Sequence, residues 1–317
     1  MTPDHYEVSS AGRRRLSGNL PKRGTRLGMS DGAGLAFGGV FVAVGAYIIL
    51  IGTKIVTVNP ARVHAPYWVL TVAGLSFALG GFMVWGMTWK QFAAERRRVE
   101  AMRRHPDEPA LADYPWHPGG FTVSEWPGAA KAFAWAMGMT VFFSIFNWWA
   151  WGPMGDWFVK SMVSLFDLIN LAFWLAALRQ LARAIKFGHS RVEFTTFPCR
   201  PDNPVVLRWQ PGSGVSRINR GTFTFRCVEE WMESTGYGKN RSVIVVHEEL
   251  WSAQGILEQP RTLQPREAVE LRYELPPDAR STHLDAGKPL FWELEVKLEL
   301  PGLNFNETYL VPVYGKA

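Results

Sequence analysis

The chain has 317 residues, 47% of them hydrophobic, and its 34 Lys and Arg against 28 Asp and Glu give a formal net charge of +6. The excess positive charge lies in the first 189 residues, which carry a net +8, because residues 190–317 contain 15 Lys and Arg against 17 Asp and Glu. A nucleic-acid-binding domain carries its own basic surface, so this distribution argues against a nucleic-acid partner. The length favours two structural units.

The first 31 residues are rich in Gly, Ser and Arg and show little periodicity. Such composition predicts a mobile basic tail over residues 1–31. Beyond it, residues 32–189 form a candidate membrane domain, and residues 190–317 have the composition of an ordinary soluble domain.

Four runs in the candidate membrane domain are apolar on every face and nearly free of charge. At about 1.5 Å of rise per residue, each run crosses the roughly 30 Å hydrocarbon layer of a bilayer, which predicts four transmembrane helices. The first run is longer than the apolar core of a cleaved signal sequence, so we expect it to be a retained anchor. The four runs are residues 32–52, 67–89, 129–151 and 157–178.

Basic residues flank these four helices asymmetrically. The connections 53–66 and 152–156 carry only Lys54 and Arg62, whereas sixteen Lys and Arg lie on the other side. The positive-inside bias therefore predicts a protein of the bacterial inner membrane with its N-terminus and its C-terminal domain in the cytoplasm. The sixteen are Arg13, Arg14, Arg15, Lys22, Arg23, Arg26, Lys90, Arg96, Arg97, Arg98, Arg103, Arg104, Arg179, Arg183, Lys186 and Arg191.

The second apolar run continues as a basic juxtamembrane helix over residues 90–105, which Pro106 stops. Basic side chains at the inner surface attract anionic lipids, so we expect lipid headgroups as partners of this helix. The expected headgroup contacts are Arg96, Arg97, Arg98, Arg103 and Arg104.

Residues 107–128 are dense in Pro, Gly and aromatic residues. Amphipathic rings are favoured at the headgroup level, so this segment is expected to be an interfacial loop. Its aromatic residues are Tyr114, Trp116, Phe121 and Trp126.

The fourth apolar run holds one acidic residue, Asp167, near the bilayer midplane. An ionised aspartate at that depth costs about 2.5–3.5 kcal/mol on translocon scales, so polar partners are expected. The short connection 152–156 makes the third and fourth helices antiparallel neighbours, so that depths can be matched by counting from their outer ends. The count predicts a polar seam with the pairs Asn147–Ser161, Ser144–Ser164 and Thr140–Asp167, and with Asn170 on the same face.

Three roles for Asp167 remain open. In the first, Asp167 is protonated and stabilises the seam, because a neutral carboxyl avoids the cost of a buried charge and can donate a hydrogen bond. In the second, it pairs with a basic group of another subunit. In the third, it carries protons or ions, although one acid alone makes a poor path through a membrane.

After residue 189 the hydrophobic periodicity changes from helical to two. In FWELEVKLEL, residues 291–300, apolar and charged residues alternate, as they do in a strand with one buried face. About seven such segments, joined by glycine-bearing turns, predict a cytosolic antiparallel β-sandwich. The segments are residues 191–197, 204–209, 221–228, 241–251, 267–275, 291–300 and 306–314.

The sequence contains no clear motif for catalysis, a metal or a cofactor. The seven His are scattered, and HxxxH, HExxH, GxSxG, GxxxxGK[ST] and GxGxxG are all absent. Cys199 and Cys227 belong to the domain placed in the reducing cytosol, so we expect two partly buried strand residues without a disulfide. These features favour a protein that is not an enzyme and uses no cofactor.

The closing residues resemble the last strands of arrestin-like, immunoglobulin-type sandwiches. The resemblance rests on a Leu-Pro-Pro turn at residues 275–277, an alternating strand led by Phe291 and Trp292, and a last strand that ends in Pro-Val at residues 312–313. Because arrestin-like sandwiches usually bind partner proteins, this resemblance implies a role in protein interaction.

A wider resemblance covers residues 114–314. Its order of Tyr-Pro-Trp at residues 114–116, Trp126, a helical pair and a sandwich is similar to that of a family of proteobacterial inner-membrane proteins that carry a domain of unknown function. The resemblance implies no catalytic residues. Family members have a longer soluble insert between the first two helices, where this chain has only residues 53–66, so any role of that insert does not transfer.

The sequence therefore favours a non-enzymatic inner-membrane protein that presents a cytosolic β-sandwich to a protein partner, as an accessory subunit of a membrane complex. The alternative is a small transporter or proton-linked membrane component that uses Asp167. An enzyme acting on lipid at the inner surface is a third hypothesis, and it would require convergent polar side chains in a deep pocket.

Overall fold

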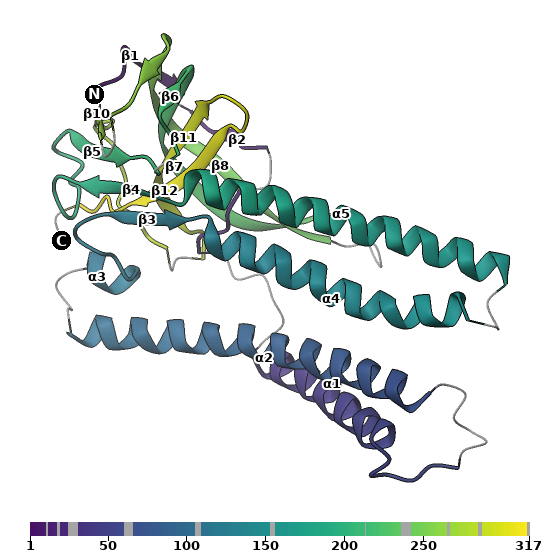
Figure 1. The fold of residues 1–317 in the computed structure, drawn as a ribbon. Coiled ribbons are helices and arrows are strands. Elements are labelled where there is room, and N and C mark those ends of the chain that lie inside the picture. Colours follow the sequence, from purple (N-terminus) through teal and green to yellow (C-terminus); the bar gives the residue numbers. More distant parts are fainter. Residues whose placement is uncertain are drawn as a thin grey trace. The chain divides into compact units, whose positions relative to one another are not determined.

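The computed structural model describes residues 1–10, 12–17, 20–24, 31–59, 66–104, 109–152, 156–212, 214–235, 242–264, 267–284 and 287–315. The chain divides into two compact units, whose elements are labelled in Figure 1. The helical unit comprises Gly28–Arg96 and Trp126–Ala182, and the β unit comprises Met1–Leu27, Arg97–Glu125 and Arg183–Ala317.

The helical unit consists of four long apolar helices. The C-terminal ends of two of them, α2 and α5, belong to the β unit. Each helix is long and apolar enough to cross a membrane. Many of their large apolar side chains are exposed, such as Trp157 at 77% and Leu168 at 63%, and surface of this kind is favourable in hydrocarbon rather than in water. The helices are α1 (Asp31–Gly52), α2 (Tyr67–Arg104), α4 (Trp126–Ala150) and α5 (Trp157–Phe187).

Glycines bring α1 and α2 into close contact. A Cβ on Gly45 would lie 2.6 Å from the carbonyl oxygen of Gly74, and a Cβ on Gly81 would lie 2.6 Å from that of Gly38. Any side chain at these positions would push the two helices apart, as is usual where small residues line a membrane-helix interface. The indole Nε1 of Trp85 closes the same contact by donating to the carbonyl of Leu35 at 2.9 Å.

Two antiparallel sheets pack face to face in the β unit. The six-stranded sheet has the order β1 (His5–Ser10), β8 (Ser242–Leu257), β7 (Arg220–Thr235), β11 (Leu290–Glu299), β12 (Phe305–Val311), with β2 (Arg14–Arg15) beside β8. The four-stranded sheet has the order β10 (Val269–Tyr273), β5 (Val205–Gln210), β4 (His189–Phe194), β3 (Phe121–Ser124). Trp209 of the four-stranded sheet meets the rings of Phe223 and Phe305 of the six-stranded sheet, with centroids 5.6 and 5.7 Å apart. The core therefore lies between the sheets, as the alternating pattern predicts.

All seven strand segments predicted after residue 189 are confirmed as strands. They are β4 (His189–Phe194), β5 (Val205–Gln210), β7 (Arg220–Thr235), β8 (Ser242–Leu257), β10 (Val269–Tyr273), β11 (Leu290–Glu299) and β12 (Phe305–Val311). Two short strands, β6 (Arg217–Ile218) and β9 (Arg261–Thr262), form a separate pair.

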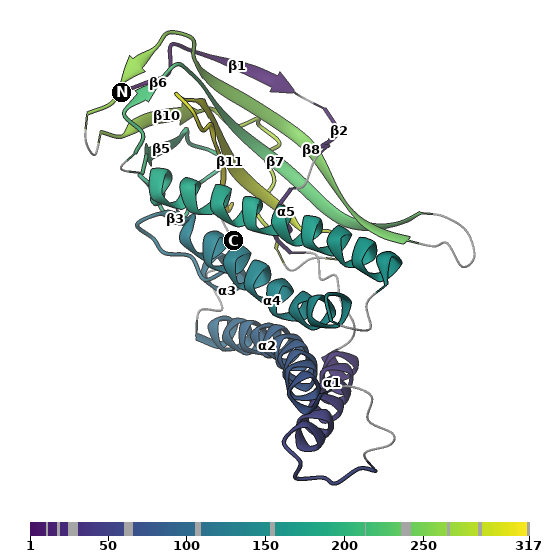
Figure 2. The same ribbon diagram turned by 45° about the vertical axis from the view of Figure 1, so that its right-hand side comes forward.

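The first residues of the chain are not the mobile tail that the composition predicts. β1 (His5–Ser10) pairs antiparallel with β8, and β2 (Arg14–Arg15) continues along the same strand, as Figure 2 shows. The edge of β8 carries backbone donors and acceptors that need partners, and β1 and β2 supply them. The paired residues of β8 lie more than 230 positions away in the sequence, so local periodicity did not reveal the pairing.

The segment expected as an interfacial loop is instead largely part of the β unit. It contains α3 (Pro109–Asp113) and β3 (Phe121–Ser124), and β3 pairs with β4. Trp116 is buried, and its indole donates to the hydroxyl of Tyr314 at 3.1 Å. Burial of the Trp116 ring with its N–H hydrogen-bonded is more favourable than the expected position of this ring among lipid headgroups. Trp126, at the start of α4, is 46% exposed.

Single residues join the helix pair α4–α5 to the four-stranded sheet. Glu125 separates β3 from α4, Gly188 separates α5 from β4, and the N–H of Glu125 donates to the carbonyl of Gly188 at 3.1 Å. Gly188 has a φ of +57°, and its N–H donates to the carbonyl of Ala184 at 2.9 Å, so it caps the C-terminus of α5. Phe187 lies within the β core against Phe305, with ring centroids 5.1 Å apart.

Candidate functional site

The predicted polar side chains of α4 and α5 form two contacts between the helices. Asn147 Nδ2 donates to Asp167 Oδ1 at 2.7 Å, and Asn170 Nδ2 donates to Thr140 Oγ1 at 3.1 Å. The indole of Trp174, which sequence reasoning missed, also donates to Thr140 Oγ1, at 2.9 Å. Three serines bond instead to carbonyls of their own helices: Ser144 to Val141, Ser161 to Trp157 and Ser164 to Lys160.

The pairs therefore differ from those matched by depth. Asp167 contacts Asn147, although Asn147 lies six positions closer than Asp167 to the outer end of the helix pair. Thr140 contacts Asn170 instead of Asp167. Side chains on a helix lean toward its N-terminus, so those on antiparallel neighbours lean in opposite directions along the pair. Short serine side chains return to their own backbone, which removes them from the seam.

The arginines expected at lipid headgroups lie at the C-terminal end of α2, between Arg96 and Arg104. Arg96, Arg97, Arg103 and Arg104 are exposed, and Arg104 forms an ion pair with Glu100 one turn away. The side chain of Arg98 lies outside the described residues.

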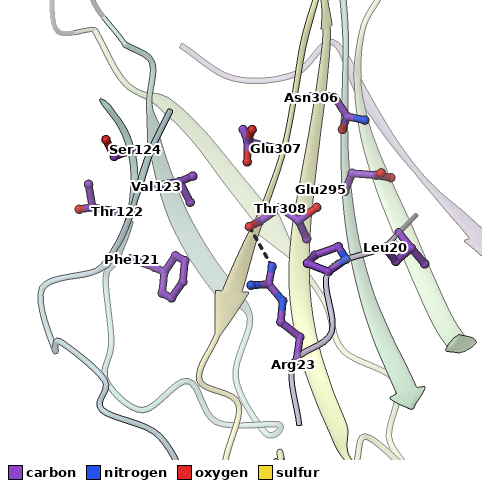
Figure 3. Close-up of a pocket in the computed structure, with 11 residues that line it drawn as sticks. Leu20, Arg23, Phe121, Thr122, Val123, Ser124, Glu295, Asn306, Glu307 and Thr308 are labelled. Atoms are coloured by element: carbon purple, nitrogen blue, oxygen red, sulfur yellow. Dashed lines mark hydrogen bonds between the residues drawn. The ribbon is translucent and has the colours of Figure 1, made fainter. Parts of the chain in front are cut away.

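The β unit has a groove of about 610 Å³ between β3 and β12. β3 is an edge strand of the four-stranded sheet and β12 is an edge strand of the six-stranded sheet, so the groove lies between two sheet edges, as Figure 3 shows. The N-terminal segment contributes a third side. The lining includes Leu20, Pro21, Arg23, Thr122, Ser124, Glu295, Asn306, Glu307 and Thr308.

Two carboxylates beside the groove share one guanidinium. Arg183 Nη2 lies 2.5 Å from Glu125 Oε1 and 3.3 Å from Glu307 Oε1. Burial, and then the like charge of Glu125, raises the pKa of Glu307 to about 7, although Arg183 opposes the shift. The site therefore holds a carboxyl group that exchanges a proton near neutral pH. Sequence reasoning missed it, because its members come from positions 125, 183 and 307.

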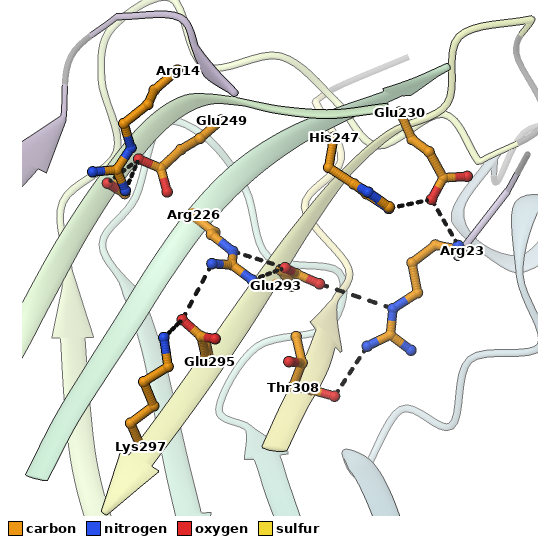
Figure 4. Close-up of polar contacts among 11 residues, drawn as sticks. Arg14, Arg23, Arg226, Glu230, His247, Glu249, Glu293, Glu295, Lys297 and Thr308 are labelled. Atoms are coloured by element: carbon orange, nitrogen blue, oxygen red, sulfur yellow. Dashed lines mark hydrogen bonds and ion pairs between the residues drawn. The ribbon is translucent and has the colours of Figure 1, made fainter. Parts of the chain in front are cut away.

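A buried ion cluster lies on the outer face of the six-stranded sheet (Figure 4). Arg226 on β7 bridges two glutamates of β11, with Nη2 2.6 Å from Glu293 Oε1 and Nη1 3.2 Å from Glu295 Oε2. Lys297 adds a second cation to Glu295 at 2.9 Å. Burial alone would lower the pKa of Arg226, but the two glutamates outweigh it and raise that pKa above its ordinary value. Arg226 therefore stays charged and holds β7 to β11.

The outer face of the six-stranded sheet also binds residues 20–24 of the N-terminal segment. Glu230 is fully buried and accepts the backbone N–H groups of Arg23 at 3.0 Å and Gly24 at 3.3 Å, while His247 Nε2 lies 2.9 Å from it. The Arg23 guanidinium then donates to the carbonyl of Thr308 at 3.1 Å, at the groove (Figures 3 and 4). Residues 20–24 therefore form a fixed wall of the groove.

Both cysteines are buried and form no disulfide. Burial raises the pKa of each thiol to about 12, so neither is a thiolate at neutral pH. Over the described part of the chain, no group of three or more His, Cys, Asp or Glu side chains is arranged to hold a metal ion.

No protein-family model and no curated protein matches the sequence. Among solved structures, the chain is similar to Spo0M, a sporulation control protein from Bacillus subtilis, at 15% identity with a TM-score of 0.25. The match covers 39% of this chain and 48% of that one, so the chain spans about half the length of Spo0M. The family resemblance of the C-terminal motifs stays a prediction.

Proposed function

We propose that this protein is a multi-pass protein of the bacterial inner membrane whose β unit lies in the cytoplasm and binds a protein partner, as an accessory subunit of a membrane complex. The proposal assigns it no catalytic role. Its membrane portion is α1, α2, α4 and α5, and the exposed arginines on α2 bind anionic lipid headgroups.

Strand pairing supports the topology. β1 pairs with β8 and β3 pairs with β4, which requires residues 5–10, 121–124 and 189–257 to lie on the same side of a membrane. Two apolar helices separate the first of these segments from the second, and two separate the second from the third, so the parity is satisfied. The excess of basic residues beside these segments favours the cytoplasmic side.

The observation that carries the binding role is the groove between β3 and β12. Polar and charged side chains from both strands and from residues 20–24 line this groove, including Arg23, Thr122 and Glu307. Here two edges flank a groove of about 610 Å³, a volume within the roughly 300–1,000 Å³ of typical ligand sites.

Affinity purification of the tagged full chain from membranes in mild detergent, after cross-linking, tests the proposal. We expect one protein to be recovered in constant proportion and to be absent from a matched purification of an unrelated four-helix membrane protein. Recovery of the chain alone in several detergents, with and without cross-linking, would rule the binding role out.

The transporter hypothesis depends on Asp167, and the bond to Asn147 supports a structural role instead. Asp167→Asn keeps the shape and can still bond Asn147, so we expect unchanged folding and unchanged partner recovery. Asp167→Leu removes the bond between the helices and leaves Asn147 Nδ2 only its bond to the carbonyl of Phe143 on its own helix, so it should lower the free energy of unfolding of the detergent-solubilised chain by about 0.6–1.7 kcal/mol. A folded Asp167→Asn variant that loses a proton flux measured in vesicles would establish the transporter hypothesis.

A further inference from the structure

We infer that a second pocket of the β unit, with a volume of about 300 Å³, binds an apolar α-amino acid in its zwitterionic form. The apolar side chain of the ligand contacts two tryptophans, and its charged groups meet an aspartate and an arginine at the rim. The inference goes beyond the proposed function, because a small-molecule site needs no protein partner. The lining includes Arg13, Leu250, Trp251, Asp278, Arg280 and Trp292.

The buried part of this pocket is apolar. Trp251 on β8 and Trp292 on β11 are the cross-strand neighbours of Cys227 on β7, so the three side chains lie on the same face of the sheet. Both tryptophans are buried, and the centroids of their rings lie 5.6 Å apart. The indole N–H of Trp251 donates to no other described residue, so an oxygen of a bound ligand can accept it. Contact with the two rings favours an apolar group on the ligand.

The strand pairing is interrupted beside the same pocket. Leu250 is an extra residue in β8, a β-bulge between the residues that pair with Cys227 and Val228 on β7. β1 ends at Ser10 and β2 begins at Arg14, so the pairing of β8 with the N-terminal strands is also interrupted at this point. Bulges are frequent next to binding sites, because they break the regular packing of a sheet. The irregularity therefore leaves room for a ligand at the end of the core.

The rim of the pocket carries opposite charges that do not pair with each other. Asp278 and Arg280 are exposed, and neither side chain forms an ion pair or a hydrogen bond with another described residue. Arg13 adds a second cation, since its contact with Glu248 is long, at 3.6 Å, and its side chain is 65% exposed. A ligand with a single charge would be attracted by one of these groups and repelled by another. A ligand that carries both an ammonium and a carboxylate matches the rim.

The backbone at the rim is held in place. Trp292 Nε1 donates to the carbonyl of Arg280 at 2.8 Å, and the N–H of Ala279 donates to the carbonyl of Pro276 at 3.0 Å in a turn. In an α-amino acid, the ammonium, the carboxylate and the side chain share one carbon atom, so charged groups at the rim direct the side chain toward the tryptophans. The volume lies at the lower limit of the roughly 300–1,000 Å³ of typical ligand sites, which favours a molecule of this size.

Isothermal titration calorimetry of the full chain in detergent tests the inference, with L-phenylalanine as the probe. We expect saturable binding with a Kd below about 1 mM. Three comparison ligands each lack one feature: phenylpropionate lacks the ammonium, phenethylamine lacks the carboxylate and glycine lacks the apolar side chain. Each should bind at least about fivefold more weakly than L-phenylalanine.

Two variants assign the charged groups. Asp278→Asn should weaken L-phenylalanine about fivefold without weakening phenylpropionate, which has no ammonium to lose a partner. Arg280→Gln should weaken L-phenylalanine about fivefold without weakening phenethylamine, which has no carboxylate. Glu270→Gln is the matched control, because Glu270 is an exposed carboxylate of the β unit outside the pocket, and it should change no affinity. Thermal denaturation checks that each variant remains folded.

Four results would overturn the inference. These are the absence of saturable binding up to about 10 mM, equal affinities for glycine and L-phenylalanine, unchanged affinity for L-phenylalanine in both pocket variants, and equal weakening of phenylpropionate and L-phenylalanine by Asp278→Asn. None of them depends on the recovery of a partner protein, so the inference and the proposed function are tested separately.

Discussion

Glu307 should make the stability of the β unit depend on pH. Its pKa is raised from an ordinary 4.5 to about 7, so the folded state binds the proton more tightly than the unfolded state does. The stability that this proton contributes is complete below the unfolded pKa and is lost as pH rises toward 7. We expect Glu307→Gln to melt at a higher temperature than wild type at pH 8 and at the same temperature at pH 4.

Glu270→Gln is the matched control for this titration, because Glu270 is exposed beside Arg208. Three charged groups also act on the pKa of Glu307. They are Arg183 on α5, Glu125 immediately before α4, and Arg23 in residues 20–24. Parallel melting curves of wild type and Glu307→Gln over the whole range would show that Glu307 does not titrate near neutrality.

Arg226 should be the most costly single basic residue to remove from the outer face of the six-stranded sheet. Arg226→Met leaves Glu293 and Glu295 buried without their cation, which should cost about 3–5 kcal/mol. Arg208→Met removes an exposed pair with Glu270 and should cost at most about 1 kcal/mol. Chemical denaturation followed by tryptophan fluorescence compares the two, and equal losses would contradict the burial of the Arg226 cluster.

At the residue scale, composition and spacing identified four of the side chains that meet between α4 and α5, but not their pairs, and they wrongly included three exposed serines. The four are Thr140, Asn147, Asp167 and Asn170, and the serines are Ser144, Ser161 and Ser164. Asp167 meets Asn147 because side chains on antiparallel helices lean in opposite directions, a displacement that a depth count omits. Glu125, Arg183 and Glu307 gave no signal, since residues so far apart in sequence become neighbours only after the sheets form.

At the scale of elements, β1 and β2 pair with the edge of β8 and so protect it from other strands. Deleting residues 1–16 removes β1 and β2 and exposes the edge of β8, so we expect lower stability and self-association through that edge. Size-exclusion chromatography of the solubilised chain measures this.

Replacing Arg13, Arg14 and Arg15 together with Gln separates charge from strand pairing. These arginines pair with Glu248, Glu249 and Glu233. Their side chains are 59–65% exposed, so the ion pairs contribute little and the triple variant should elute at the same volume as the wild-type chain. If the triple variant self-associates to the same extent as the deletion variant, the ion pairs rather than the strand pairing protect the edge of β8.

Elements with a strong internal period were predictable, and elements defined by a distant partner were not. The apolar runs became α1, α2, α4 and α5, and FWELEVKLEL became β11, because their side chains alone determine the buried surface. β1 and β3 are short and are stabilised by β8 and β4, so nothing within them marks a strand. In the sequence, Trp116 resembles an aromatic residue at the lipid headgroups, because its buried hydrogen-bond partner Tyr314 is distant in the chain.

For the whole molecule, the proposed topology places the β unit in one compartment and the connection between α1 and α2 in the other. Because Cys199 and Cys227 are buried, single cysteines placed at exposed positions can report the compartment without removing the native thiols. Thr57 in the α1–α2 connection and Glu270 on β10 are exposed and suit this purpose.

The most direct test is the reaction of Thr57→Cys and Glu270→Cys with a membrane-impermeant maleimide in intact spheroplasts and after their permeabilisation. We predict that Thr57→Cys reacts in intact spheroplasts and that Glu270→Cys reacts only after permeabilisation. Reaction of Glu270→Cys in intact spheroplasts would place the β unit outside the cytoplasm and contradict the account.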